Sequence, residues 1–325
     1  MRQYLAFSTI CLALCLTSCK STLTNPPAET LPGTDSHGNV TLPVPPADSG
    51  IQIVFGPFAV PQGQEVQIDH WFKLKTTLPF EVGRIQIATN LGTHHMNLFR
   101  TLTPHADSNE YNFSSTAIWN ESDLMIESQQ HYIDWSLPTG VSVHLNSAEQ
   151  MCMQVHYVNA STQTTPNDSG KVVINIWKAN GPATQPASML FAQDTAVLIK
   201  PHSDTSFSKF CRFAGTTKPL AIYAMTGHFH SRGKSFVVEK WDSVNNASLG
   251  EVYRSVAWSE PPFKVFDPPL TLNPGEMIKY TANYHNDSDS TIKFGPHVET
   301  QEHCNLFLWF TPGYLGGKTI YDKTN

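Results

Sequence analysis

Short apolar runs separated by turn-forming residues recur along the chain from residue 51 onward. No long run repeats apolar positions at the 3.6-residue spacing of an amphipathic helix, so substantial helices are not expected. Runs of this length that are rich in β-branched and aromatic residues are typical of β-strands. In the first half of the chain these runs are IQIVFGPFAV, HWFKLKT, VGRIQIAT, HHMNLFR, MCMQVHYVN and KVVINIW. In the second half they are LAIYAM, GHFH, KSFVVEKW, EVYRSVAW, MIKYTANYHN and NLFLWF.

The segment KANGPATQPAS, residues 178–188, interrupts the series with one glycine and two prolines. It predicts a domain boundary, because such residues punctuate regular structure. We therefore expect an all-β fold of two antiparallel β-sandwich domains in tandem, covering residues 51–182 and 183–325.

The N-terminus reads as a targeting segment. Arg2 precedes the apolar stretch YLAFSTICLALCL, which is too short to span a membrane as a mature helix. The following LTSC resembles the bacterial lipobox, so residues 1–18 are the expected signal peptide and Cys19 the expected lipidated residue. An ordinary secretory signal is the alternative. Lys20 stands where many Gram-negative lipoproteins retained at the inner membrane have Asp, so the resemblance implies the outer membrane.

Residues 19–50 are rich in Ser, Thr, Pro and Gly, which predicts a disordered tether without a packed core. No later stretch is apolar and long enough to cross a membrane. Together these features predict an exported protein of the cell envelope that contacts the membrane through its lipid anchor.

Charge excludes one class of partner. The chain has 21 Lys and Arg against 27 Asp and Glu, a net charge of −6, so it lacks the basic surface expected of a nucleic-acid-binding protein. No Ser/His/Asp or paired-carboxylate motif stands out, and the sequence does not identify a protein partner. The 14 histidines instead indicate a capacity to bind metal ions.

Two histidine pairs have spacings that bear on metal binding. His228 and His230 lie two residues apart, so on a strand they share a face, with Phe229 on the other. Two exposed or separately bonded histidines are the alternative. His94 and His95 are adjacent, and an ideal strand sends them to opposite faces. They can bind one ion only at a strand end or bulge, or through different ring nitrogens.

Two further histidines are unremarkable when taken alone. His156 lies in MQVHYVN, where alternation puts Gln154 on its face and Val155 on the other. A lone strand histidine is usually structural. His303 stands directly before an apolar run, next to Cys304.

As an ordered series, HHM, QVHY, HxH and CNLF resemble the copper type II, ascorbate-dependent monooxygenases, the family of peptidylglycine α-hydroxylating monooxygenase and dopamine β-monooxygenase. The resemblance runs from about residue 51 to about residue 315 and includes FDPPLTLNPGEMIKYTANYHN. It implies two jelly-roll-like β-sandwich domains that each hold one copper ion, facing each other across a wide solvent-filled cleft.

The resemblance assigns the first copper, which passes electrons, to the N-terminal domain. Its implied ligands are His94, His95 and His156, and Gln154 matches a family residue near this ion.

The second copper, which handles oxygen and substrate, is assigned to the C-terminal domain through His228, His230 and His303. The family has Met at the position of His303. A thioether favours Cu(I), whereas imidazole is harder and also supports Cu(II). Alternatives are that His303 is not a ligand or that Met225 substitutes, although Met225 lies an odd number of residues before His228 and so on the other strand face. Three imidazoles would also suit zinc.

Substrate anchors of the peptide-acting enzymes are missing. Thr226 and Phe307 stand where those enzymes have the Arg and Tyr that hold a substrate carboxylate, while Asn305 matches. The implied substrate is therefore an uncharged or less polar small molecule rather than a peptide ending in glycine.

Three cysteines remain after the signal and Cys19. Cys152, within MCMQVHYV, is expected to be a small buried hydrophobe. The resemblance makes a Cys211–Cys304 disulfide conceivable as a rearranged pairing, and two unjoined thiols are the alternative.

The implied function is an exported copper-dependent monooxygenase that hydroxylates a C–H bond of a small molecule with O₂, using ascorbate or another external reductant and two copper ions. The alternative is a non-catalytic copper-binding lipoprotein that buffers, delivers or senses copper. The other histidines are expected at the surface, in turns or behind the ligands: His37, His70, His105, His131, His144, His202, His285 and His297.

Overall fold

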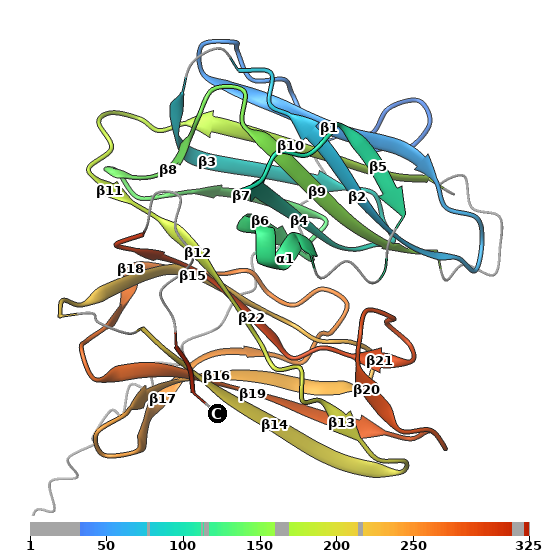
Figure 1. Cartoon of the computed structure of the whole chain (residues 1–325), viewed down its shortest axis with the longest axis vertical. Helices are drawn as coiled ribbons and strands as arrows, with labels where there is room; N and C mark the ends of the chain where they lie inside the picture. The colour runs from blue at the N-terminus through green and yellow to red at the C-terminus, as the bar shows by residue number, and fades with distance from the viewer. Residues whose placement is uncertain are drawn as a thin grey trace, which may run out of the picture. The chain divides into compact units, whose positions relative to one another are not determined.

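In the computed structural model, strands account for nearly all regular structure among the described residues, which are 33–76, 79–111, 113, 117–159, 169–213, 217–313 and 322–324. The predicted all-β fold is confirmed (Figure 1). The first-half elements are β1 (Gly50–Ala59), β2 (Glu65–Lys73), β3 (Phe80–Thr89), β4 (Thr93–Thr101), β5 (Ser108–Tyr111), α1 (Ala117–Glu121), β6 (Ser122–Ser128), β7 (Tyr132–Ser136), β8 (Val141–Leu145), β9 (Gln150–Val158), β10 (Ser169–Lys178) and β11 (Gln185–Pro186).

The second-half strands are β12 (Ser188–Gln193), β13 (Leu198–Ile199), β14 (Ser203–Arg212), β15 (Leu220–His228), β16 (Gly233–Asp242), β17 (Ala247–Ser255), β18 (Lys264–Leu272), β19 (Glu276–Asn286), β20 (Ile292–Phe294), β21 (Gln301–Glu302), β22 (Asn305–Thr311) and β23 (Asp322–Thr324). The chain passes from the first set of sheets to the second between β11 and β12. The predicted boundary after residue 182 falls in the connection between β10 and β12.

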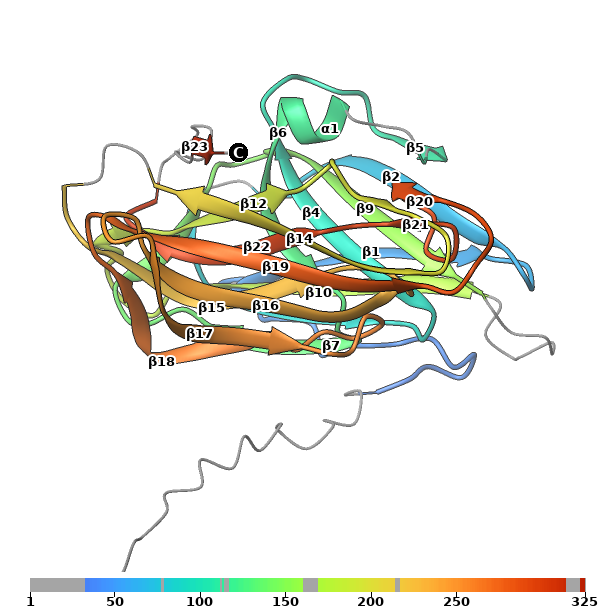
Figure 2. The ribbon, with the colours of Figure 1, turned by 90° about the horizontal axis from the view of Figure 1, so that it is seen from below.

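Two sheets form the first sandwich. One has the order β1-β10-β3-β8-β11, with β7 also paired with β3, and the other, here called the β9 sheet, has the order β5-β2-β9-β4-β6. All strand pairs within these sheets are antiparallel except β11 with β8. Figure 2 shows α1 at one edge, next to β6, which it contacts.

Alternation gives the β9 sheet two different faces. Met96 and Leu98 of β4 and Val155 of β9 lie in the apolar core of the first sandwich. Residues of opposite parity, such as Asn97 and His156, are also buried but polar, and they face away from that core. The pattern read from MQVHYVN is therefore confirmed, and the polar face of this sheet carries the site.

The second sandwich pairs two antiparallel sheets, the β22 sheet (β12-β22-β15-β18) and the sheet β17-β16-β19-β14-β23, with a small sheet β13-β20-β21 beside them. Alternate residues of β22 enter different cores. Leu306 and Leu308 join the second core. Phe307 and Trp309 join the first. Because both of its faces are buried, this strand reads as the continuous apolar run NLFLWF.

The packed region begins earlier than expected. Val40 and Leu42 are 1% and 6% exposed and pack on Ala88 and Val173. The prediction of a tether without packing therefore does not hold for residues 33–50. Val40 and Leu42 cover apolar side chains on the outside of the first sandwich. The expected signal peptide and Cys19 lie outside the described residues.

No disulfide links the described cysteines. Cys152, Cys211 and Cys304 are buried thiols. Cys211 and Cys304 both lie in the second core without joining, which corrects the conceivable bridge. Cys152 is a buried residue as predicted. None of the helices in the described part of the chain is long and apolar enough to cross a membrane.

Candidate metal centre

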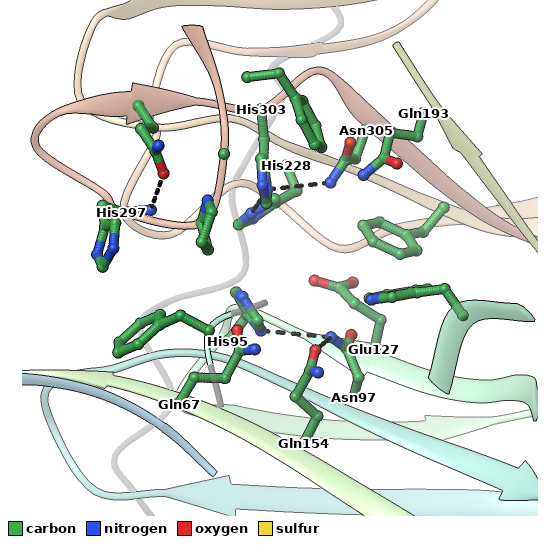
Figure 3. Close-up of a pocket in the computed structure, with 17 residues that line it drawn as sticks. Gln67, His95, Asn97, Glu127, Gln154, Gln193, His228, His297, His303 and Asn305 are labelled. Carbon is green, nitrogen blue, oxygen red and sulfur yellow. Dashed lines mark hydrogen bonds between the residues drawn. The ribbon is translucent and has the colours of Figure 1, made fainter. Parts of the chain in front are cut away.

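All six histidines of the two predicted ligand sets meet in one cluster where the polar face of the β9 sheet opposes the β22 sheet (Figure 3 shows His95, His228 and His303). Within the first set, ring centroids lie 5.0–5.3 Å apart. Within the second set they lie 4.4–5.2 Å apart. Between the sets, His94 lies 5.1 Å from both His228 and His230, and His95 lies 5.0 Å from His228.

A local irregularity lets adjacent His94 and His95 both enter this cluster. Gly92 has φ +96° in the turn before β4, and a side chain there would collide with the ring of Tyr157. The pairing of β4 with β9 then shifts register between Thr93 and His95. Such a bulge re-aims a side chain, which is one of the conditions under which the sequence allowed this pair to share one site.

His228 and His230 reach the cluster from the end of β15. Phe229 is buried on the other side, in the second core, as the spacing predicts. Behind the pair, Gly227 lies so close to the ring of Phe236 that an added Cβ would stand 2.4 Å from it.

The loop after β15 is held by one buried carboxyl group. Glu302 accepts hydrogen bonds from the backbone amides of His230 (2.8 Å), Arg232 (2.6 Å) and His303 (3.3 Å). Burial raises the pKa of Glu302 to about 8, although these amides and nearby Arg232 oppose the shift. Glu302 therefore ties both histidine-bearing segments of the second sandwich together.

The cluster is buried and its imidazoles are neutral near pH 7. Burial, and then repulsion between neighbouring imidazoles, holds the pKa of His94, His95, His228 and His303 well below its usual value. Burial lowers the pKa of His230 to about 3. Neutral imidazole is the form that binds a metal ion, so at pH 7 these rings need not lose the proton of an imidazolium before coordination.

In the first sandwich, two of the histidines are engaged by hydrogen bonds. Asn97 Nδ2 lies 3.5 Å from His95 Nδ1, His95 Nε2 lies 3.3 Å from His156 Nδ1, and His156 Nε2 lies 2.8 Å from Glu65 Oε1. The Asn97 amide NH₂ group can only donate and the Glu65 carboxylate can only accept. His95 Nε2 therefore donates to His156 Nδ1, and His156 Nε2 donates to Glu65.

Glu65 also joins the two sandwiches. It accepts hydrogen bonds from His297 Nδ1 at 3.1 Å and from the Val298 amide at 3.0 Å. Burial alone would raise the pKa of Glu65, but the hydrogen bonds from His156, Val298 and His297 outweigh it and lower the pKa to about 2. The group is therefore a carboxylate throughout the physiological range.

Three other ring nitrogens have no hydrogen-bond partner among the described residues, namely His94 Nε2, His228 Nδ1 and His230 Nε2. The same three residues offer ligand atoms that all lie within 4.8 Å of one another. Buried polar atoms are normally satisfied, so an unpartnered ring nitrogen on each of these three neighbouring residues indicates that the cluster binds an electron-pair acceptor. Imidazole nitrogen suits copper and zinc, so these residues fit a metal ion.

Backbone and side-chain contacts select which nitrogens of the second-sandwich pair stay free. His230 Nδ1 lies 3.0 Å from the carbonyl oxygen of Gln301, so Nδ1 carries the hydrogen and Nε2 a lone pair. Asn305 Nδ2 lies 3.3 Å from His303 Nδ1, which makes that nitrogen an acceptor. His228 Nε2, 3.0 Å from the same atom, is then a second donor that shares the one lone pair of this nitrogen, and Nδ1 of His228 keeps its own lone pair.

The arrangement differs from the one that the resemblance implies. The two histidine sets are not separated by a wide cleft, because Phe307 and Trp309 of β22 pack into the first core and bring the sheets together. The group of ligand atoms that converges takes His94 from one set and His228 and His230 from the other. His303 instead holds His228 through its Nδ1. Met225 lies in the second core, away from the cluster, as its strand parity predicts.

A cavity of about 490 Å³ adjoins the cluster. The two predicted neighbours of the metal sites, Gln154 and Asn305, both line this cavity, and so does Phe307. Thr226 pairs with Phe307 across β15 and β22 and is buried. Figure 3 shows Gln154 and Asn97 rising from the β9 sheet and Asn305 and Gln193 descending from the β22 sheet.

Sequence reasoning missed the carboxyl groups Glu65, Glu127 and Glu302. Each sits in a short stretch, QEVQID, LMIES or TQEHC, that gives no ligand spacing. His297 was expected behind the ligands or at the surface, and it lies beside the site against Glu65. A signal existed only for Glu302, which directly precedes the predicted ligand His303.

A match to a known protein family covers only the second half of the chain. A glycosylasparaginase from Flavobacterium meningosepticum, PNGase F, aligns over 80% of this chain and 94% of its own with 10% identity and a TM-score of 0.36. The major capsid protein P2 of bacteriophage PM2 aligns over 80% and 97% with 9% identity and a TM-score of 0.28. No relative was found among curated protein sequences. Residues 187–317, which include His228, His230 and His303, match the family model described as copper type II ascorbate-dependent monooxygenase, C-terminal domain.

Proposed function

We propose that this protein is an exported copper-dependent monooxygenase that hydroxylates a C–H bond of a small molecule. The observation that carries the proposal is the convergence of His94, His228 and His230 within 4.8 Å, with one unpartnered nitrogen on each ring. The family match over residues 187–317 supports copper as the metal.

Bound copper would supply one-electron redox chemistry and reactivity toward O₂. In the overall reaction, one oxygen atom enters the C–H bond as a hydroxyl group and the other leaves as water. Two electrons from an external reductant such as ascorbate, with two protons, complete the balance. The protein excludes bulk water from the buried cluster and keeps its imidazoles neutral.

Three residues would orient the ligand nitrogens. The Gln301 carbonyl fixes the tautomer of His230. His303 accepts the hydrogen of His228. Glu302 holds the backbone of both segments. Such outer partners typically change metal affinity by about 10–100-fold when they are removed.

The resemblance implies a second copper ion held by His94, His95 and His156. Because this proposal gives His94 to the first ion, the second would keep His95 and His156, whose facing nitrogens share a hydrogen bond of 3.3 Å. Binding there would require that hydrogen to leave, so this ion should bind more weakly than the one at His94, His228 and His230.

A non-catalytic copper-binding protein is the second candidate. It is favoured by Thr226 and Phe307, which replace the substrate-anchoring Arg and Tyr of the peptide-acting relatives, and by the burial of the cluster. Such a protein would buffer, deliver or sense copper with the same ligands.

One experiment on the purified protein tests both candidates. Elemental analysis should find copper in preference to zinc, and EPR of the Cu(II) form should report nitrogen ligands. Reductant-dependent O₂ consumption with a hydroxylated product then indicates the enzyme. Copper binding without O₂ consumption beyond that of free copper indicates the storage protein, and retention of zinc alone contradicts both.

Localisation rests on Cys19 and the LTSC motif. We propose acylation of Cys19 and anchoring at the outer membrane. Cys19→Ser should release the protein from membranes or block its processing. Mass spectrometry of membrane-extracted mature protein that finds an unmodified Cys19 would contradict this proposal.

A further inference from the structure

The cavity beside the histidine cluster offers hydrogen-bond acceptors without partners. Glu127 Oε1 and Oε2, Asn97 Oδ1 and Asn305 Oδ1 have no partner among the described residues. All three residues line the cavity, and each is at most 3% exposed. Figure 3 shows the Glu127 side chain reaching from the first sandwich into the space between the sheets. Buried oxygens in this state indicate a ligand that brings donors.

A row of side chains across the β9 sheet fixes the direction of these groups. Asp69, Gln154, Asn97 and Glu127 occupy facing positions on β2, β9, β4 and β6. Asp69 Oδ1 accepts from Gln154 Nε2 at 2.9 Å, and Gln154 Oε1 accepts from Asn97 Nδ2 at 3.2 Å. Because each amide donates toward Asp69, the oxygen of Asn97 is left facing Glu127 and the cavity.

The second sandwich repeats this orientation. Asn305 Nδ2 is directed at His303 Nδ1, 3.3 Å away, so its oxygen is the atom left over. Unused acceptors therefore approach the cavity from both sheets. The described lining residues include no lysine or arginine. Aromatic rings of Phe113, Trp119, Phe294 and Phe307 form part of the wall, and glutamine and histidine side chains line much of the remainder.

Burial favours the neutral form of the Glu127 carboxyl group. Burial raises its pKa to about 8, and no other cause contributes. A protonated carboxyl group donates one hydrogen bond and accepts another, which matches a hydroxyl group. An ammonium group would need the ionised form, and burying an ion pair costs more than burying a neutral pair. A carboxylate ligand would face four oxygens without a countercharge.

We propose that this cavity binds a neutral polyhydroxylated molecule, whose hydroxyl groups donate to Asn97 and Asn305 and exchange hydrogen bonds with Glu127. Apolar C–H faces of such a molecule pack on the aromatic wall. Glu127 is the residue that selects a hydroxyl group over an ammonium or carboxylate group. The identification of this molecule as the substrate rests on the proposed function, whereas its binding does not require a metal ion.

Isothermal titration of the metal-free full chain with two matched series tests the proposal. The probes are glucose, glucosamine and gluconate, and glycerol, 3-amino-1,2-propanediol and glycerate. At least one neutral member should bind, and its amine and acid counterparts should bind at least about tenfold more weakly, as expected when a buried polar group is mismatched. Failure of both neutral members to bind, or tighter binding of a matched amine or acid, overturns the proposal.

Two substitutions at Glu127 separate the neutral acid from the charged one. Glu127→Gln keeps a donor and an acceptor and should change the affinity for the neutral probe by less than about threefold, whereas Glu127→Leu should lower it at least about tenfold. Exposed Glu110→Leu on β5 is the control and should leave the affinity unchanged. If Glu127→Leu does not fold, the conservative variant decides, because a tenfold loss in Glu127→Gln contradicts a neutral carboxyl group.

Copper titration of the same metal-free samples keeps the two ideas apart. Polyol binding without copper binding would refute the proposed function and leave this inference standing. Copper binding without polyol binding would refute the inference alone.

Discussion

The two histidine sets differ in how their ring nitrogens are used. In the first sandwich, His95 is hydrogen-bonded to His156 and His156 to Glu65, so the facing nitrogens of the two rings are satisfied without a metal. At the end of β15, His228 Nε2 and His230 Nδ1 make hydrogen bonds, whereas the other nitrogen of each ring has no partner among the described residues. His94 stands with the second group. Proximity alone therefore does not make a ligand, and hydrogen-bond partners decide which imidazoles are available.

The strongest test of this difference is to remove a ligand with an unpartnered nitrogen. His230→Ala should weaken the tightest copper ion by more than about 100-fold, beyond the range typical of outer partners. Copper titration against a competing chelator measures it. His285→Ala, an exposed histidine paired with Asp204, is the matched control and should bind as the wild type does. Equal affinities in both variants would remove His230 from the site.

Glu65→Gln should break the anchor of the engaged pair. We expect a loss of about 1.5–3 kcal/mol of stability at pH 7, the usual range for a hydrogen bond to a charged group. Because the folded pKa of about 2 lies below the ordinary value of 4.5, this stabilisation is present above pH 4.5 and is lost as the pH falls toward 2.

Urea unfolding at pH 7 and pH 3 measures this contribution. The gap between wild type and Glu65→Gln should shrink at the lower pH. A gap that is constant or widens on acidification would show that Glu65 is not held as a carboxylate by these contacts.

His303→Ala distinguishes a ligand from a positioning residue. Since His303 Nδ1 accepts the hydrogen of His228, its loss should weaken the tightest copper ion by about tenfold, through the freedom it gives His228. X-ray absorption should still count the same number of imidazoles on that ion. A lower count would make His303 a ligand, as the family position implies.

The smallest effect is expected at the engaged pair. His156→Ala should change the affinity of the tightest copper ion by less than about threefold, because its nitrogens bond to His95 and Glu65. A loss as large as that in His230→Ala would erase the distinction between the two sets.

Much of this site could be predicted from local pattern. Alternation in MQVHYVN places Gln154 and His156 on one face. The adjacency of His94 and His95 requires a bulge, a strand end or different ring nitrogens if both bind one ion, and the structure has the bulge. Both inferences depend only on strand geometry.

The rest depends on contacts distant in sequence. The joining of the two sets requires that Phe307 and Trp309 enter the first core, which a continuous apolar run cannot specify. Glu65 and Glu127 arrive from β2 and β6. The β6 segment SDLMIES is short and mixed in polarity, so it was not predicted as a strand. Nothing in the sequence therefore indicated that Glu127 belongs to the site.

The central claim is that one copper ion is held jointly by both sandwiches, through His94, His228 and His230. Pulsed EPR with one equivalent of Cu(II), compared between wild type and His94→Ala, tests it most directly. The account predicts three coupled imidazole nitrogens in the wild type, two in the variant, and a matching loss of affinity. An unchanged spectrum and affinity in His94→Ala would show that the second sandwich binds its ion alone, and would contradict the claim.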